Sequence, residues 1–268
     1  MTHQLDIELS PELEPFREKI ESTVKPFIAI HPEKNEDLTW WQSQFGGLPY
    51  WPKESEYPKD AQGYPLFLLA QINFEEVPYL EGFPQTGILQ FYIANDEIYG
   101  ADFDNPTLPY GFRVIYFPKI SKSEADLVTD FSFLSEQEEY YTPLSGTGCS
   151  LQFKKKMAPV SLSDYRFEDF FGDEFFEQFG SKELDIFEEY TDKFPEEGHK
   201  IGGYAYFTQM DPRPPLVEGE KYILLLQIDT DNSVGIMWGD SGVGNFFIKQ
   251  QDLEQLDFSK VLYNWDCH

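Results

Sequence analysis

The chain has 268 residues, 41% of them hydrophobic and 17% aromatic, which is enough to bury a core without help from a metal or a disulfide. Its 48 acidic and 20 basic residues give a formal net charge of -28, which repels nucleic-acid phosphates and anionic membranes. We therefore expect no nucleic-acid partner and no membrane partner, and a protein partner should be basic.

The acidic surface has a second explanation, because net charge also keeps an aromatic-rich protein in solution. No apolar run approaches the roughly 18 residues of a membrane helix, and the opening segment 1–16 lacks the basic and apolar regions of a signal peptide. Cys149 and Cys267 lie far apart and form no metal-type or redox-type spacing. We expect a cytoplasmic protein with two free thiols and no cofactor.

The first predicted element is an amphipathic helix over 10–24, since Ser10 can cap it and Pro11 suits its first turn. A strand over 27–32 follows. Short apolar runs bounded by Gly, Pro, Asn or Asp predict further strands at 64–74, 87–94, 111–118, 148–154, 221–230, 234–239 and 245–249. Aromatic residues at helical spacing predict helices within 163–179 and 181–194.

Part of the chain repeats. An ungapped shift of 156 residues superposes eight identical residues in 27 columns, where composition alone gives about two. The matches pair Gly46 with Gly202, Gly47 with Gly203, Tyr50 with Tyr206, Gly63 with Gly219, Leu68 with Leu224, Leu69 with Leu225, Gln71 with Gln227 and Ile72 with Ile228. We expect an α+β fold in which two related, mostly antiparallel β-rich units, at about 46–93 and 202–248, arose by internal duplication. One compact domain, 1–268, should hold both units, the N-terminal helix and a helical insert at about 163–193.

Seven motifs occur in order along nearly the whole chain. They are GGLPYWP at 46–52, FLLAQINFEE at 67–76, GILQFY at 87–92, HKIGGYAYFTQMDPR at 199–213, LLLQID at 224–229, MWGDSGVGNFFI at 237–248 and DFSKVLYNWDC at 257–267. Together they resemble the YwqG-like family of bacterial proteins. The resemblance implies an α+β fold with an internal duplication, and no activity, because none is established for the family. Members near polymorphic toxin genes suggest an immunity-type role.

Two segments imitate catalytic or metal sites. GDSG at 239–242 resembles the nucleophile segment of serine proteases, but none of the four histidines stands in a matching motif, so a tight turn explains Ser241 better. Four residues within 229–240 match positions of a calcium loop, yet Val234 replaces the glycine that its sharp turn needs. We expect no catalytic residue and no metal ligand.

The candidate ligand or partner residues fall into two sets. Gln71 and Gln227 interrupt apolar runs at corresponding places, so their amides either bond the neighbouring Gly-Gly segments, bond each other, or face a cleft. The cleft set is Trp51, Gln71, Tyr206, Arg213, Gln227 and Trp238, with His199 as a further ligand-contacting residue. Arg213 has a simpler role open to it, a local ion pair in the turn Asp211–Arg213. The acidic set is Glu168, Asp169, Asp173 and Glu174 of the helical insert.

Three functions stay open. The leading one is a non-catalytic cytosolic binding protein, with an immunity-type inhibitor of a basic toxin as its specific form. The second is a small-ligand module with its site between the two repeats, and the third is an unrecognised hydrolase. Sparse histidines and the lack of a metal spacing or a phosphate loop weigh against the hydrolase.

Overall fold

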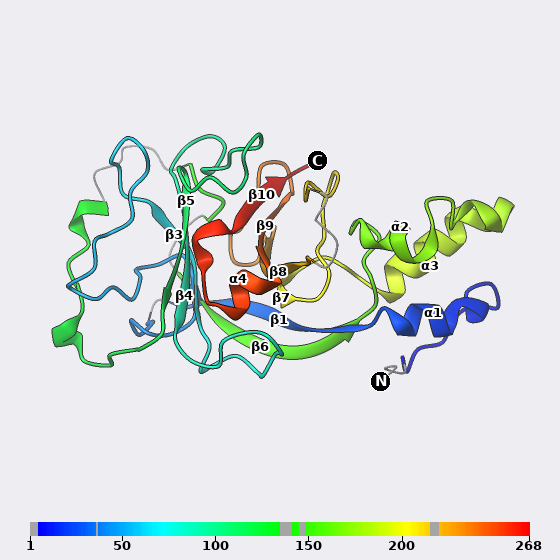
Figure 1. Cartoon of the computed structure of the whole chain (residues 1–268), viewed down its shortest axis with the longest axis horizontal. Helices are drawn as coiled ribbons and strands as arrows, with labels where there is room; N and C mark the ends of the chain where they lie inside the picture. Colours follow the sequence, from blue (N-terminus) through cyan, green and yellow to red (C-terminus); the bar gives the residue numbers. More distant parts are fainter. Residues whose placement is uncertain (1–4, 36, 135–140, 145–147, 215–219) are drawn as a thin grey trace.

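Ten strands form one continuous antiparallel sheet in this computed structural model (Figure 1). The structure describes residues 5–35, 37–134, 141–144, 148–214 and 220–268. The strands are β1 (Lys25–Lys34), β2 (Gln44–Phe45), β3 (Phe67–Asn73), β4 (Ile88–Ile93), β5 (Phe112–Phe117), β6 (Cys149–Ala158), β7 (His199–Gly202), β8 (Tyr222–Asp229), β9 (Val243–Lys249) and β10 (Leu262–Asp266). Most follow runs of branched and aromatic residues, which suit a pleated surface.

The helices are few and short. They are α1 (Arg17–Ser22), α2 (Arg166–Phe171), α3 (Glu183–Lys193) and α4 (Gln250–Glu254), joined by the single-turn or irregular 3-10 elements η1 (Glu14–Phe16), η2 (Glu124–Asp126), η3 (Ser132–Leu134), η4 (Glu177–Lys182) and η5 (Phe258–Lys260). None of the helices in the described part of the chain combines the length and the apolar character needed to cross a bilayer.

The strand order is β10-β9-β8-β7-β1-β6-β2-β3-β4-β5. Two groups of four strands therefore flank a central pair, β1 and β6, which are antiparallel over ten residue pairs from Lys25↔Ala158 to Lys34↔Cys149. On its other side β1 pairs with β7, and β6 pairs with β2. Each long central strand thus joins the group that belongs to the other half of the chain, which locks the halves together.

The two groups of strands share local details. The register shifts between Leu68 and Ala70 where β3 meets β4, and between Leu224 and Leu226 where β8 meets β9. Each group also has a Gly-Gly turn in the left-handed region, at 46–47 with φ of 64° and 72° and at 202–203 with φ of 74° at both residues. A side chain is strained in that region, so glycine is required at both turns.

The sheet coils until its outer strands meet across the core. The ring of Phe91 on β4 lies 4.9 Å from that of Phe246 on β9, and Phe112 on β5 lies 5.3 Å from Tyr263 on β10. The Tyr263 hydroxyl also donates to the carbonyl of Tyr99 at 3.0 Å. Strands β4 and β9 are buried nearly along their whole length, which explains their continuous apolar sequences and produces one compact domain.

The helical insert and the N-terminal helix form a second, smaller core. Phe16 beside α1 packs edge-on against Phe175 with ring centroids 5.1 Å apart, and Phe167 of α2 packs against Tyr190 of α3 at 5.5 Å. Figure 1 shows α1, α2 and α3 together at one end of the molecule, beyond the ends of β1 and β6. The helices predicted within 163–193 are confirmed as α2, η4 and α3.

Some sequence predictions differ from the structure. The strand predicted at 234–239 is wrong, because Gly235 and Gly239 take positive φ and Ile236 makes only isolated bridges. The N-terminal helix is shorter than 10–24: Ser10 does accept a hydrogen bond from the Leu13 amide, but the 3-10 turn η1 begins at Glu14 and the α-helix α1 only at Arg17. Strands β2, β7 and β10 and helix α4 were not predicted, since they are too short to show periodicity.

The two glutamines satisfy their amides with backbone groups next to the Gly-Gly turns. Gln71 Oε1 accepts from the Tyr50 amide at 2.8 Å, and its Nε2 donates to the carbonyls of Trp40 and Gln42 at 2.9 and 2.7 Å. Gln227 Oε1 accepts from the Tyr206 amide at 2.8 Å, and its Nε2 donates to the Gly198 carbonyl at 2.7 Å. The two side chains bond equivalent backbone groups and do not bond each other.

We expect Gln71→Leu and Gln227→Leu to lower the free energy of unfolding by about 2–5 kcal/mol each, because buried amides and carbonyls lose their partners. The measurement is urea unfolding followed by tryptophan fluorescence. Gln62→Leu on the exposed loop is the control and should change stability by less than about 0.5 kcal/mol. Core variants as stable as the control would contradict the assigned role of the amides.

Candidate functional site

The residues expected to line a cleft lie mostly in the core. Trp51, Gln71, Gln227 and Trp238 are at most 3% exposed, and Tyr206 is half-buried. Trp51 packs against Tyr57, Tyr92 and Phe117 in the first half of the chain, whereas Trp238 packs against Tyr99 and Trp265. None of the six residues Trp51, Gln71, Tyr206, Arg213, Gln227 and Trp238 lines either of the two cavities described below.

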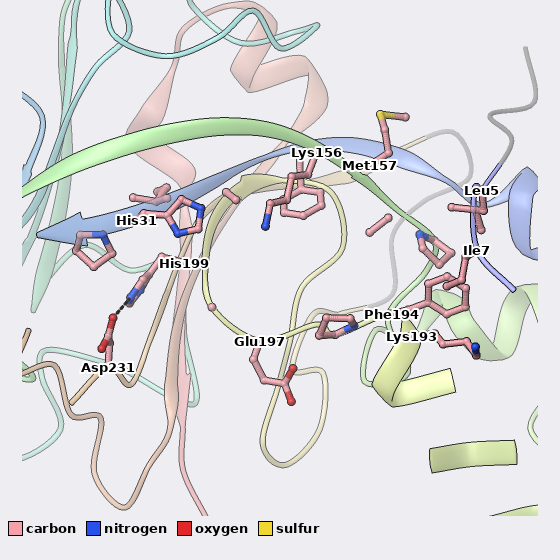
Figure 2. Close-up of a pocket in the computed structure, with 18 of the residues that line it drawn as sticks. Leu5, Ile7, His31, Lys156, Met157, Lys193, Phe194, Glu197, His199 and Asp231 are labelled. Atoms are coloured by element: carbon pink, nitrogen blue, oxygen red, sulfur yellow. Dashed lines mark hydrogen bonds and ion pairs between the residues drawn. The ribbon is translucent and has the colours of Figure 1, made fainter. Parts of the chain in front are cut away.

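His199 does line a cavity, which we call the histidine cavity. It has a volume of about 480 Å³ and lies between β1, the end of β6 and the segment 193–199. Figure 2 shows His31 and His199 close together at one end, with Leu5, Ile7 and Phe194 at the other. Its ionisable lining side chains are Asp6, His31, Lys156, Lys193, Glu197, His199 and Asp231, so acids outnumber lysines by one.

Both ring nitrogens of His199 are engaged. Nδ1 accepts a hydrogen bond from the Asp229 amide at 3.0 Å, so the proton of the neutral ring is on Nε2, which lies 3.5 Å from Oδ2 of Asp231. Burial lowers the pKa of His199 to about 4, although Asp231 acts in the opposite direction. The imidazole is therefore neutral near pH 7 and ties β7 to β8.

This geometry does not suit a general base or a metal ligand. A catalytic histidine keeps one lone pair directed at the nucleophile, whereas the only lone pair of neutral His199 accepts from the backbone. Ser241 lies elsewhere, on an exposed turn with φ of 58°. Within the described residues, no group of three or more His, Cys, Asp or Glu side chains is placed to hold a metal ion.

The acids of the calcium-like segment have local partners. The Asp229 carboxylate accepts from the amides of Gly198 and Thr230, at 2.6 and 2.8 Å. Asp231 accepts from the amide and the hydroxyl of Ser233, at 2.9 and 2.6 Å. Burial raises the pKa of Asp231, but these bonds and His199 outweigh it, so the pKa is lowered overall. The segment is a hydrogen-bonded turn that fixes the end of β8.

Arg213 forms the predicted ion pair with Asp211 and also a buried one with Asp164. Its Nη2 lies 2.9 Å from Oδ2 of Asp164, which is paired with Arg166 as well. Burial would raise the pKa of Asp164, but Arg166 and Arg213 lower it to about 2. The Arg213 guanidinium lies between Tyr165 and Phe247, 4.7 and 4.6 Å from the ring centroids. This network holds the helical insert on the group of strands β7 to β10.

A second cavity, which we call the lysine cavity, lies where the halves meet. It has a volume of about 520 Å³ and is lined by 80–83 from the first half and by β8, α4 and the second Gly-Gly turn from the second. The ionisable side chains around it are Lys25, Glu81, Arg166, Lys221, Tyr222 and Glu254. Three cations thus face two carboxylates, although acids exceed bases by 28 in the chain as a whole.

Lys25 has an unusual environment in this cavity. Its Nζ lies 4.3 Å from the centroid of the Tyr204 ring, and no described carboxylate lies within ion-pair distance of it. Burial lowers the pKa of Lys25 to about 8, and Arg166 and Lys221 contribute in the same direction. Sequence reasoning missed this cluster because Lys25, Arg166 and Lys221 lie far apart in the chain and share no motif.

The acidic candidates lie on the surface of the helical insert. Glu168 and Asp169 are on α2, Asp173 and Glu174 follow it, and all four are exposed. Three apolar side chains of the same insert are also exposed: Phe170 at 36%, Leu184 at 65% and Phe187 at 43%. We call these four acids and three apolar residues the helical face. Between 163 and 193 the chain has eleven acidic and three basic residues, so the helical face is strongly negative.

His199 should make the protein less stable in acid. The pKa of His199 is lower in the folded protein than in the unfolded chain. Between about pH 6.5 and pH 4 the unfolded chain therefore binds more protons than the folded protein, and stability falls as the pH is lowered through that range. The side-chain oxygen of an asparagine can still accept from the Asp229 amide. We therefore expect the His199→Asn variant to lose about 3 kcal/mol less unfolding free energy than the wild type between pH 7 and pH 4. Urea unfolding at several pH values measures this, and His268→Asn should keep the wild-type slope.

Asp164→Asn should destabilise the protein by about 3 kcal/mol or more, because it leaves Arg213 buried with a weaker set of partners. Chemical unfolding measures the loss, and Asp169→Asn on the exposed surface of α2 is the matched control. An Asp164→Asn variant as stable as the Asp169→Asn control would mean that the buried pairs do not hold the helical insert.

Comparison with known proteins gives a family and no activity. The family model described as "Domain of unknown function (DUF1963)" matches residues 43–267, which include every strand except β1. No curated protein matches the chain. Because the match covers most of the sequence and nearly all of the sheet, the protein belongs to the DUF1963 family.

Proposed function

We propose that the protein is a non-catalytic cytosolic binding protein whose helical face takes up a basic protein partner. The observation that carries the proposal is the combination of exposed Phe170, Leu184 and Phe187 with surrounding acids on one projecting part of the molecule (Figure 1). Apolar contacts surrounded by polar groups are typical of protein interfaces, and the negative charge selects a basic partner.

The interface would use each kind of side chain differently. Leu184 and Phe187 lie one turn apart on α3, so they can enter the same depression of a partner. The acids mainly speed the encounter, because attraction between opposite charges acts over about 10 Å at moderate salt. An immunity-type inhibitor of a basic toxin is the specific form that we propose, supported by the charge and by the resemblance to YwqG-like proteins.

Two finer assignments belong to the same proposal. We place the chain among the YwqG-like members of DUF1963, on the seven motifs quoted above. We also propose that the two groups of strands arose by internal duplication. The shared register shifts, the paired Gly-Gly turns and the equivalent bonds of Gln71 and Gln227 support it.

A second candidate function is the binding of a small ligand between the two halves. The lysine cavity favours it, because its lining comes from both halves and its volume suits a small molecule. This function uses none of the residues of the helical face, so the two candidates can be tested independently.

The first candidate predicts that binding depends on salt and on the helical face. A pull-down from the native host should capture a basic protein, and its association rate should fall about tenfold or more between low and physiological ionic strength. The variant with Glu168→Gln, Asp169→Asn, Asp173→Asn and Glu174→Gln should lose a similar factor in association rate and little in dissociation rate. Surface plasmon resonance with the purified partner measures both rates.

The matched control neutralises four exposed acids away from the insert, Glu54, Glu56, Glu97 and Asp104. It should change the association rate by less than about threefold, although it alters the net charge equally. If both variants slow association equally, net charge alone and not the helical face guides the partner. If neither has an effect, the electrostatic proposal fails.

A further inference from the structure

We propose that the lysine cavity binds a small organic anion, with its carboxylate or phosphate beside Lys25 and Lys221 and its apolar part against Leu80, Phe83 and Leu253. The proposal rests on the second candidate function above and adds the chemical class of the ligand. The cavity provides the space for a small molecule. Its cations indicate that the ligand is negatively charged, and its apolar wall indicates that the ligand also has an apolar part.

The arrangement of cations is difficult to explain by stability alone. Lys25 is partly buried beside Arg166 and Lys221, and like charges near each other repel. Arg166 is compensated by Asp164, but neither Lys25 nor Lys221 has an ion-pair partner among the described residues. A bound oxyanion would supply a negative charge beside the partly buried Lys25 and the exposed Lys221.

The walls of the cavity indicate an anion with an apolar part. Leu80 and Phe83 come from the first half, and Leu253 comes from α4 of the second half. Gly202 belongs to the floor, and a Cβ there would lie 2.8 Å from Leu80 Cδ2, so glycine lets the loop 80–83 approach. The carboxylates of the lining, Glu81 and Glu254, are both exposed and disfavour an anion only at the rim.

The test uses isothermal titration calorimetry of the full chain with four probes: phenylacetate, phenyl phosphate, inorganic phosphate and neutral benzyl alcohol. We expect at least one aromatic anion to bind and benzyl alcohol to bind at least about tenfold more weakly. The two aromatic anions distinguish a carboxylate from a phosphate ligand, and inorganic phosphate shows how much the oxyanion contributes alone.

Variants locate the site. Lys25→Gln and Lys221→Gln, tested separately, should each weaken the binding of the anion by about tenfold or more, because each variant removes a charge-assisted hydrogen bond. Lys156→Gln, in the histidine cavity, is the matched control and should leave the affinity unchanged. Since Lys221 is exposed, its variant should stay folded even if Lys25→Gln does not.

A second readout needs no variant. Trace acetic anhydride labels neutral amines, and because the pKa of Lys25 is lowered by burial, its amine is neutral more often near pH 7.5 than that of an ordinary lysine. A bound anion should slow the acetylation of Lys25 at least about threefold, by covering the amine and raising its pKa, while Lys156 is unaffected. Mass spectrometry of the digested protein measures both rates.

The outcomes separate the proposals. Equal binding of benzyl alcohol and the anions, or full affinity in both lysine variants, would overturn the anion assignment and leave the small-ligand function in place. If no probe binds and the acetylation of Lys25 is unchanged, both fail. None of these results bears on the helical face.

Discussion

The antiparallel pairing of β1 with β6 is the contact on which the rest of the structure depends. Within the sheet, it connects the group β7 to β10 with the group β2 to β5. Because each central strand pairs with the group of the other half, neither half can complete its sheet alone. Unpaired backbone groups at a strand edge are costly when buried, so the ten residue pairs of β1 and β6 make folding of the two halves interdependent.

Both cavities adjoin the central strand β1. The start of β1 contributes Lys25 to the lysine cavity, and its middle contributes Ala29, Ile30 and His31 to the histidine cavity. Their chemistry differs because the segments that cover them differ. The histidine cavity contains an imidazole whose nitrogens are both used within the fold, whereas the lysine cavity contains two lysines, Lys25 and Lys221, with no ion-pair partner among the described residues. The latter is therefore better suited to a charged ligand.

Much of the sheet could be predicted, because the strands are long apolar runs interrupted by glycine and proline. The strands at 64–74, 87–94, 111–118, 221–230 and 245–249 were found from this pattern, as β3, β4, β5, β8 and β9. The segment 234–239 was misjudged, since an apolar run with two glycines can equally be a buried turn. Of the candidate site residues, His199 does line a cavity in the structure, whereas Trp51 and Trp238 lie in the core. The sequence could not separate these two cases for the tryptophans, because aromatic side chains suit a core and a pocket equally.

The sequence by itself determined the alternation of strands and turns, the acidic helical insert and the two equivalent glutamines. Each of these features depends on residues that are neighbours along the chain, or on identical residues that recur 156 positions apart. Only the tertiary structure decided that β1 pairs with β7 and β6 with β2, that Arg213 is buried against Asp164, and that Lys25, Arg166 and Lys221 line one cavity. These contacts join residues far apart in the chain, and their energies depend on burial and on exact distance. Local composition carries no information on either.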